Sequence, residues 1–202
     1  MTYDVQNVAR WGSYLSPEEV ERRALMRAES RQRSFLLGRA ALRTLLADLT
    51  NTDPSRVALK VLSDGRVLAP ETPYHVSISH SGDRALAVVS TRRIGVDIEQ
   101  IAERPESLLR YVLHQDEVDH VERLPVPQEE TLFLCWTIKE AVLKALGTGL
   151  MRSPKSVRMN IDYENRRAIV RDETESTWEV IFERRNDYML ALAFEPVDQI
   201  KT

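Results

Sequence analysis

The spacing of apolar residues alternates along the chain between the period of a helix and the period of a strand. From residue 16 to 49 they recur every three or four positions, which is typical of helices. From residue 57 to 99 they form short runs between turn-forming residues, which predicts strands, the first of them over VALKVL at 57–62. Residues 106–124 and 128–147 again have a helical pattern, and the segments after Ser153 again resemble strands. This order predicts an α+β fold.

Particular residues mark the expected ends of helices. Ser16 is a suitable N-cap, and the proline that follows it fits the first turn of a helix. Two prolines separate the two later helical segments. Gly147 and Gly149 are expected to end the last of these helices, because glycine commonly follows a helix C-terminus.

A similar succession of residues occurs twice. RAALRTL at 39–45 resembles EAVLKAL at 140–146, and DRALAVV at 83–89 resembles DYMLALA at 187–193. The two matches have the same order and nearly equal offsets, of 101 and 104 residues. A repeat of this kind predicts two duplicated α+β lobes.

The boundary between these lobes is expected near Thr91 to Gly95, which divides the chain into residues 1–93 and 94–202. Clefts between lobes are common ligand sites. Asp97 and Glu99 follow the boundary directly, so we expect both carboxylates to lie beside such a cleft.

These two carboxylates belong to the segment IGVDIEQ at 94–100. Strand alternation places them on one face and the apolar residues of the segment on the other. Neighbouring carboxylates repel each other, and burying either is costly unless a cation compensates the charge. A divalent metal would supply that cation. The alternative is a solvated strand edge on which both residues pair with arginines.

A third carboxylate occurs in the helical segment FLCWTIKEAVLKALGTGL. Trp136, Glu140 and Lys144 fall on one helical stripe, and Lys139 is offset by one residue. An ordinary surface helix with a Glu140–Lys144 ion pair is one interpretation, but the large apolar Trp136 on the same stripe favours a half-buried wall of a site. Two strand carboxylates and one helix carboxylate suit Mg²⁺, which often completes its shell with water and substrate phosphates. A phosphate-bearing substrate is therefore expected.

Basic residues that could bind phosphates are concentrated in the first half of the chain. The arginines of the N-terminal helical region are Arg22, Arg27, Arg31, Arg33, Arg39 and Arg43. Arg66 follows a turn, and SISHSGD places Ser79 and His80 among small polar residues, as in an anion-binding turn. The alternatives are a solvated helix face for the arginines and a hydrogen-bonded surface residue for the histidine.

Composition narrows the classes of function. A net charge of −3 and a pI near 5.9 argue against bulk binding to nucleic acid or to a membrane surface. The single Cys135 cannot form an internal disulfide, and no apolar run is long enough to span a bilayer. With no signal-like N-terminus, the chain is expected to be cytoplasmic. The four histidines lack the spacing of a zinc site.

The sequence resembles the Sfp-type 4′-phosphopantetheinyl transferases in SISHSGD at 77–83, GVDIE at 95–99 and WTIKEAVLKALGTGL at 136–150. The blocks have that family's order and about its spacing, and the resemblance extends into the N-terminal helical region. It implies a two-lobed α+β fold with pseudo-twofold symmetry and with coenzyme A bound in the cleft. The implied reaction transfers the phosphopantetheine arm of coenzyme A to a serine of an acyl or peptidyl carrier protein and releases 3′,5′-ADP.

The resemblance also implies roles for single residues. Asp97, Glu99 and Glu140 resemble the magnesium ligands, and Glu140 also resembles the base that takes the proton from the carrier serine. Lys144 would stabilise charge at the α-phosphate and on the leaving 3′,5′-ADP, and Lys139 would assist at the same site. The expected contacts of coenzyme A are Arg39, Arg43, Arg66, Ser79, His80, Lys139 and Lys144.

The sequence departs from the family pattern at one of these contacts. Family members often have Gly-Lys-Pro ahead of the SHS block, where this chain has Gly65, Arg66 and Val67. An arginine keeps the charge of the lysine but changes its geometry.

The resemblance also bears on partners. Two lobes in one chain imply that a monomer suffices, in contrast to a class of shorter transferases that trimerise. A carrier-facing surface is expected near Leu108, Leu109, Val112 and Leu113, although a helix packed into the second lobe is the alternative.

Two non-enzymatic interpretations compete with the transferase. One is a coenzyme A-binding homologue that has lost transfer, although such a protein would be expected to lose the catalytic residues first. The other is a nucleic-acid-binding module that uses the arginine-rich helices, although these lack neighbouring aromatic residues on which bases could stack.

Overall fold

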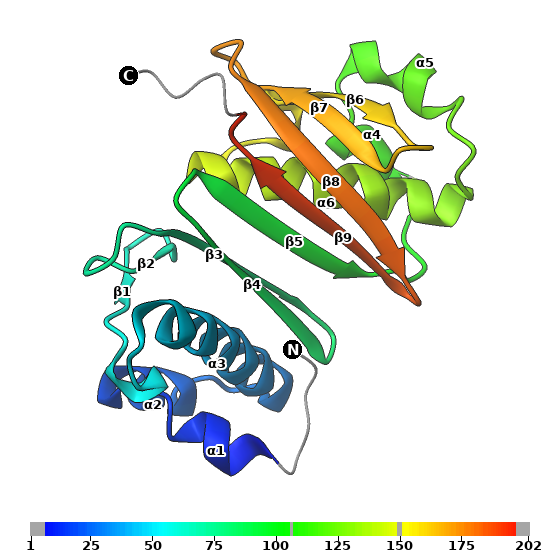
Figure 1. Ribbon diagram of the computed structural model, residues 1–202. Helices are drawn as coiled ribbons and strands as arrows, with labels where there is room; N and C mark the ends of the chain where they lie inside the picture. Colours follow the sequence, from blue (N-terminus) through cyan, green and yellow to red (C-terminus); the bar gives the residue numbers. More distant parts are fainter. Residues whose placement is uncertain (1–6, 106, 149–150, 197–202) are drawn as a thin grey trace. The chain divides into compact units, whose positions relative to one another are not determined.

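The computed structural model describes residues 7–105, 107–148 and 151–196. The chain folds into two compact units, Met1–Thr91 and Arg92–Thr202, each with its own helices and strands (Figure 1). The mixed α+β fold predicted from the periodicity is confirmed.

In the first unit, helices precede two β-hairpins. The elements are α1 (Val8–Gly12), α2 (Pro17–Ala24), α3 (Glu29–Thr50), β1 (Lys60–Val61), β2 (Val67–Leu68), β3 (His75–Ser81) and β4 (Arg84–Ser90). Ser16 caps α2 as predicted, because its hydroxyl accepts from the Glu19 N–H while the Glu19 carboxylate accepts from the Ser16 N–H. The strand expected over residues 57–62 is reduced to the two residues of β1.

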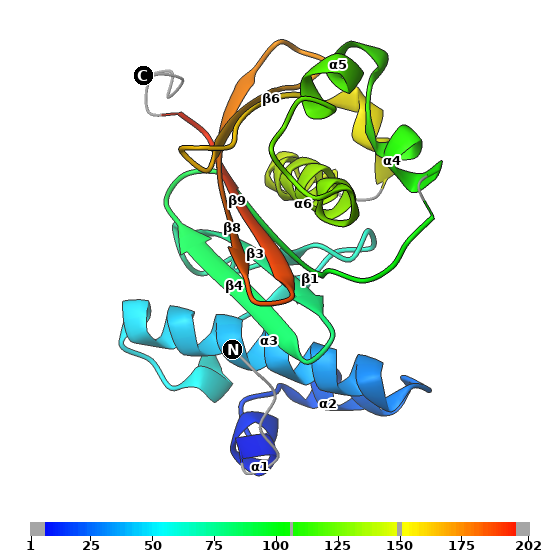
Figure 2. The ribbon, with the colours of Figure 1, turned by 90° about the vertical axis from the view of Figure 1, so that its right-hand side faces the viewer.

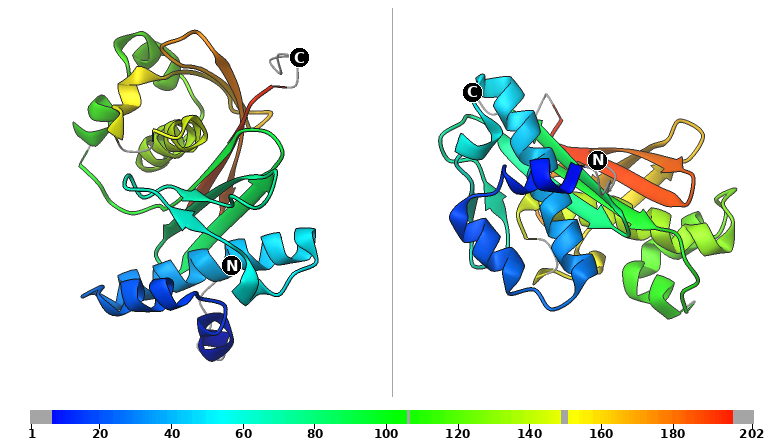
Figure 3. Two further views of the ribbon diagram at one scale, coloured as in Figure 1. Left: turned by 90° about the vertical axis from the view of Figure 1, so that its left-hand side faces the viewer. Right: turned by 90° about the horizontal axis from the view of Figure 1, so that it is seen from below.

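Helix α3 packs against the antiparallel hairpin β3–β4, and α1 and α2 lie on its other side (Figures 1 and 3). The contact is close at Gly38, where an added Cβ would lie 2.8 Å from Cγ2 of Ile78. Apolar residues of α3 form most of the core, and the fully buried ones are Leu36, Leu37, Ala40, Leu42 and Leu46.

The second unit is built around one buried helix and one antiparallel sheet. Its elements are β5 (Ile94–Gln100), α4 (Ser107–Val112), α5 (Val118–Val121), α6 (Gln128–Leu146), β6 (Arg158–Asp162), β7 (Arg167–Arg171), β8 (Thr177–Arg185) and β9 (Tyr188–Phe194). The strand order is β5-β9-β8-β7-β6. Figure 2 shows α6 nearly end-on, with the sheet curving around it and with α4 and α5 on the other side.

The predicted helix ends in this unit are partly confirmed. Helix α6 ends at Gly147 in the left-handed conformation, with φ of 75°, whereas Gly149 lies outside the described residues. The helical segment expected over 106–124 divides into α4, the 3₁₀ helix Gln115–Glu117 and α5.

Gly95 allows α6 to approach β5 unusually closely. A Cβ at this position would lie 2.0 Å from the carbonyl oxygen of Ala141 and 2.5 Å from the amide nitrogen of Ala145. No side chain fits between these backbones. Because alternate strand residues share a face, Asp97 also faces α6.

The repeated sequence segments lie on elements of the same kind. Residues 39–45 and 140–146 belong to α3 and α6, and residues 83–89 and 187–193 each cover a turn residue and most of the strand after it, β4 or β9. A helix and a strand therefore recur in each unit, and the twofold relation between them stays a prediction. Nowhere in the described ranges is a helix both long and apolar enough to cross a membrane.

Candidate active site

The close packing of α6 on β5 brings together charged residues that are 41 to 47 positions apart in the sequence. Lys144 donates a hydrogen bond from Nζ to Oδ1 of Asp97 over 2.6 Å. Glu140 lies one helical turn before Lys144 and is only 3 % exposed, as is Asp97. Glu99 is half-buried on the same strand face. The structure thus groups residues that the sequence placed on one strand face and one helical stripe.

Glu140 is held in an environment that disfavours its charge. Its Oε1 atom is buried and has no hydrogen-bond partner. Burial raises the pKa of Glu140 from its ordinary value of 4.5 to about 7; the charges of Asp97 and Glu99 add to the rise, and Lys144 opposes it. A carboxyl with a pKa near neutrality is suited to accept a proton at neutral pH.

The same carboxylates fit a hard cation in donor type and in charge. An unpartnered oxygen on Glu140, next to two further carboxylates, offers the oxygen ligands that Mg²⁺ prefers. They are not gathered into a ready ligand set, since among the described residues no group of three or more His, Cys, Asp and Glu side chains has an arrangement that could hold a metal ion. The magnesium assignment therefore remains a proposal.

The raised pKa of Glu140 predicts a pH-dependent stability in the absence of metal. The unfolded chain releases the Glu140 proton near pH 4.5 and the folded protein only near pH 7, so this residue lowers the free energy of unfolding progressively between those values. In Glu140→Gln this contribution is absent. Denaturant unfolding of both proteins in EDTA from pH 4.5 to 8 should give curves that diverge as the pH rises to 7, whereas parallel curves would contradict the raised pKa.

Lys139 does not lie in this group, although it directly precedes Glu140 on α6. Its side chain is fully buried, and its Nζ contacts Oε2 of Glu117 at 2.5 Å and the carbonyl oxygen of Val112 at 3.0 Å. Successive helix residues point about 100° apart, so Lys139 leaves α6 in a different direction from Glu140. Both contacts are made inside the protein, and the contact with coenzyme A expected for Lys139 stays a prediction.

Arg39 and Arg43 are also engaged within the protein. Both pair with the buried Glu19, at 3.0 and 2.8 Å. Arg43 is 1 % exposed, and it also donates hydrogen bonds to the carbonyl oxygens of Pro54 and Val57. These arginines hold α2 and the segment after α3 to the helix, and the contact with a nucleotide expected for them stays a prediction.

The other expected phosphate contacts lie in the first unit. His80 is exposed near the end of β3, and Ser79 beside it is buried. Arg66 is exposed and pairs with Asp64 in the turn between β1 and β2, at 2.7 Å. For these three residues a contact with coenzyme A stays a prediction.

Sequence reasoning missed two residues that shape this site. Gly95 is given no packing role in the sequence analysis, although the small Ala141 and Ala145 of α6 are a signal for close packing against it. Glu117, the buried partner of Lys139, has no signal in the sequence, because the two residues are 22 positions apart on different elements.

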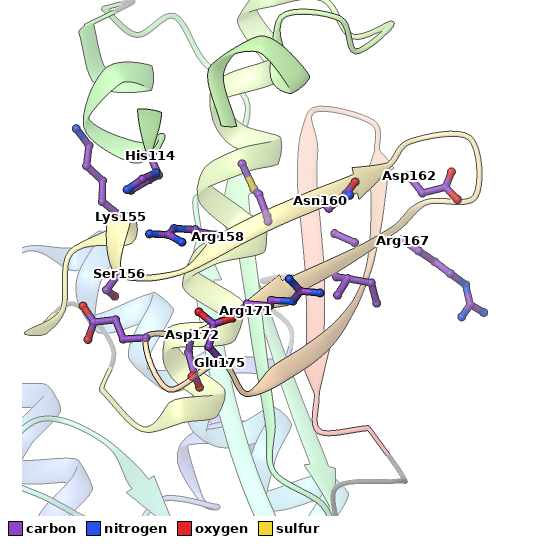
Figure 4. A pocket seen from close by; sticks show the side chains of 14 residues that line it. His114, Lys155, Ser156, Arg158, Asn160, Asp162, Arg167, Arg171, Asp172 and Glu175 are labelled. Atoms are coloured by element: carbon purple, nitrogen blue, oxygen red, sulfur yellow. The ribbon is translucent and has the colours of Figure 1, made fainter. Parts of the chain in front are cut away.

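Two hollows in the second unit lie apart from these residues. One, of about 930 Å³, lies over the outer face of β6 and β7 (Figure 4). Lys155, Arg158 and His114 gather at one end of it, but acidic residues such as Asp162 and Glu175 line it too, so its charge is mixed. The other, of about 920 Å³, is lined by residues of α4, α5 and the start of α6. Neither is lined by the carboxylates of the candidate site.

The sequence matches two family models. The model of the 4′-phosphopantetheinyl transferase superfamily matches residues 93–193. The model of the 4′-phosphopantetheinyl transferase N-terminal domain matches residues 20–90.

Curated relatives that are named 4′-phosphopantetheinyl transferase match a large part of the chain. The 4′-phosphopantetheinyl transferase HetI of Nostoc sp. is 32% identical over 148 residues, which are 68% of this chain and 62% of the relative. The 4′-phosphopantetheinyl transferase Sfp of Bacillus subtilis is 29% identical over 146 residues, 70% of this chain and 64% of the relative. This chain thus spans less than two thirds of the length of either relative.

Among solved structures, a holo-(acyl-carrier-protein) synthase from Bacillus anthracis in complex with coenzyme A (3′,5′-ADP) matches 50% of this chain and 92% of its own. The TM-score is 0.43 and the sequence identity is 21%.

Proposed function

Because the chain belongs to the 4′-phosphopantetheinyl transferase superfamily, we propose that it transfers the 4′-phosphopantetheine arm of coenzyme A to a serine of an acyl or peptidyl carrier protein. The family match, the names of the relatives and the grouping of Asp97, Glu140 and Lys144 support this function. The observation that carries it is the buried Glu140, with an unpartnered oxygen and a pKa raised to about 7.

Glu140 is the base in this proposal. The reaction needs a group that removes the proton from the serine hydroxyl as its oxygen attacks the phosphorus. A base works best when its pKa lies near the working pH, and Glu140 meets this condition in the metal-free protein. The bond between phosphorus and the 3′,5′-ADP oxygen then breaks, and the phosphopantetheine remains on the serine.

Lys144 supplies positive charge to the phosphates. Phosphoryl transfer is catalysed mostly by positioning and by cations placed where negative charge gathers. The Lys144 ammonium is part-buried next to Asp97, so its charge is less screened than that of a surface lysine. Asp97, Glu99 and Glu140 would hold Mg²⁺, which when bound would help to neutralise negative charge on the phosphates.

In this proposal the remaining contacts to coenzyme A come from His80, Ser79 and Arg66, through its phosphates. Magnesium dependence, a monomeric state and a cytoplasmic location are further parts of the proposal. They rest on the family resemblance, on the donor chemistry of the carboxylates and on the composition of the chain.

The direct test is the mass of a carrier protein. Apo acyl and peptidyl carrier proteins are incubated with this protein, coenzyme A and Mg²⁺, and with EDTA in place of Mg²⁺. A gain of one phosphopantetheine group that EDTA prevents is the expected result. If none of several carriers gains mass while coenzyme A still binds, the protein is a coenzyme A-binding homologue and the transferase proposal is wrong.

The carrier is proposed to dock on the exposed face of α4. Leu108 and Tyr111 are 40% and 54% exposed there, whereas Val112 and Leu113 are buried and belong to the core, which corrects the surface role considered for them. Leu109 is partly buried against the same core.

Leu108→Asp is expected to raise the KM for the carrier severalfold and to leave the affinity for coenzyme A unchanged, because it places a charge in an apolar contact. The measurement is steady-state transfer at varied carrier concentration. Ile169→Asp on β7 is the matched control, since Ile169 has a similar exposure of 44%. Docking on α4 would be contradicted if both substitutions raised the KM for the carrier equally, or if neither changed it.

A further inference from the structure

A buried ion pair lies on a different side of α6 from the candidate active site. The ammonium of Lys139 contacts Oε2 of Glu117 at 2.5 Å and donates to the carbonyl oxygen of Val112 at 3.0 Å. The side chains are 0% and 3% exposed, so the two charges compensate each other away from water. This pair connects α6 to the segment that follows α4.

Glu117 is itself fixed by backbone groups from two elements. Its Oε2 accepts from the His114 N–H at 2.6 Å, ahead of the 3₁₀ helix, and its Oε1 accepts from the Met159 N–H at 2.7 Å, in β6. A carboxylate bound in this way has little freedom to move. Lys139 is therefore paired with a carboxylate of the 3₁₀ helix that is itself hydrogen-bonded to β6, and not with a mobile surface side chain.

Lys139 immediately precedes Glu140 on a continuous helix, so whatever fixes the rotation of α6 at Lys139 also fixes the direction of Glu140 and Lys144. Side chains extend about 5 to 6 Å from a helix axis, so a rotation of about 10° moves their ends by about 1 Å. Errors of this size in the position of a reacting group can reduce a rate about a hundredfold.

We propose that Glu117 and Lys139 are positioning residues, which hold the rotation of α6 so that Glu140 and Lys144 face the reacting groups. This inference rests on the proposed transferase function. On the side of β5, contact at Gly95 limits how close the helix can come, and the buried pair sets its rotation from another side.

A purely structural role makes a different prediction. Buried ion pairs can often be replaced by neutral or apolar residues of similar size without loss of stability, whereas removing one partner leaves a costly unpaired charge. The double substitution Glu117→Gln with Lys139→Met removes both charges at nearly constant volume. If the pair serves only stability, a folded double variant should transfer phosphopantetheine at the normal rate.

The test is the kcat for carrier modification, the KM for the carrier and the dissociation constant of coenzyme A, measured with thermal unfolding on the wild type and the double variant. We expect a kcat at least tenfold lower, with the KM for the carrier unchanged and folding retained. A folded double variant with wild-type kcat would overturn the proposal. A wild type that modifies no carrier would instead contradict the proposed function.

Two further variants complete the test. Lys139→Arg keeps the charge but places a larger group against Glu117, so it should fold and still lower kcat; if the double variant does not fold, a wild-type kcat in Lys139→Arg overturns the proposal. Glu130→Gln is the matched control, because Glu130 is a buried carboxylate of the same helix that pairs with Arg184, ten residues before Glu140. Its kcat should stay close to that of the wild type, and an equal loss would mean that any tether of α6 has the same effect.

Discussion

Glu140→Gln is expected to lower the rate of phosphopantetheine transfer by roughly 10²- to 10⁴-fold, the usual contribution of a general base. The amide has nearly the shape of the carboxylate but cannot take the serine proton. The substitution also removes a negative charge that burial and the neighbouring Asp97 disfavour. Without metal, the variant should therefore be no less stable than the wild type. Transfer is measured by carrier mass in a single turnover, and coenzyme A binding by calorimetry.

The control for this substitution is Glu129→Gln, which makes the same change at an exposed position in the first turn of α6. It should keep wild-type activity. Coenzyme A should still bind to Glu140→Gln, because only one of several proposed contacts is altered. Wild-type turnover in Glu140→Gln would show that another group is the base, and loss of folding would show that the residue has a structural role.

Gly95→Ala is expected to destabilise the second unit severely. The added methyl group would lie 2.0 Å from the carbonyl oxygen of Ala141, and backbone atoms of a buried helix cannot move aside as the end of a flexible side chain can. Overpacking of a core usually costs about 1–3 kcal/mol, and a clash with backbone should exceed about 3 kcal/mol. Helix α6 would have to move away from β5, which would also separate Glu140 and Lys144 from Asp97.

Urea unfolding monitored by circular dichroism measures this effect. Gly12→Ala is the matched control: an added Cβ at Gly12 meets nothing within 4 Å, and alanine is favoured over glycine in a helix such as α1. The control should therefore be neutral or slightly stabilising. A Gly95→Ala protein with wild-type stability and activity would contradict the close packing of α6 on β5.

The sequence predicted those parts of the fold that depend only on residues close together along the chain. The cap at Ser16, the end of α6 at Gly147 and the alternation along β5 are each determined within a few positions. The strand predicted over 57–62 was mostly wrong, because an alternating apolar pattern also suits a segment that packs irregularly under a helix. Val57 is buried in the core cluster of α3 without belonging to a strand.

The sequence predicted the site where the functional residues share one helix or strand. It did not predict which carboxylate from another element each basic residue pairs with. Glu140 and Lys144 share a helical stripe, so the sequence alone predicts that both lie on the same side of α6. For Lys139, Arg39 and Arg43 the sequence shows a basic charge but not the buried carboxylate that each one pairs with. Those carboxylates, Glu117 and Glu19, are 20 to 24 residues along the chain from the basic residues they pair with. Only packing brings them together.

Cys135 is the single cysteine of the chain and lies fully buried in α6, where burial raises the pKa of its thiol. Thiol reagents react with the thiolate, so the folded protein should resist alkylation until the core around α6 opens. The rate of alkylation in native buffer would therefore report the opening of the core on which the site is built. Because the buried Cys135 reacts slowly, a cysteine introduced on the surface can be labelled selectively.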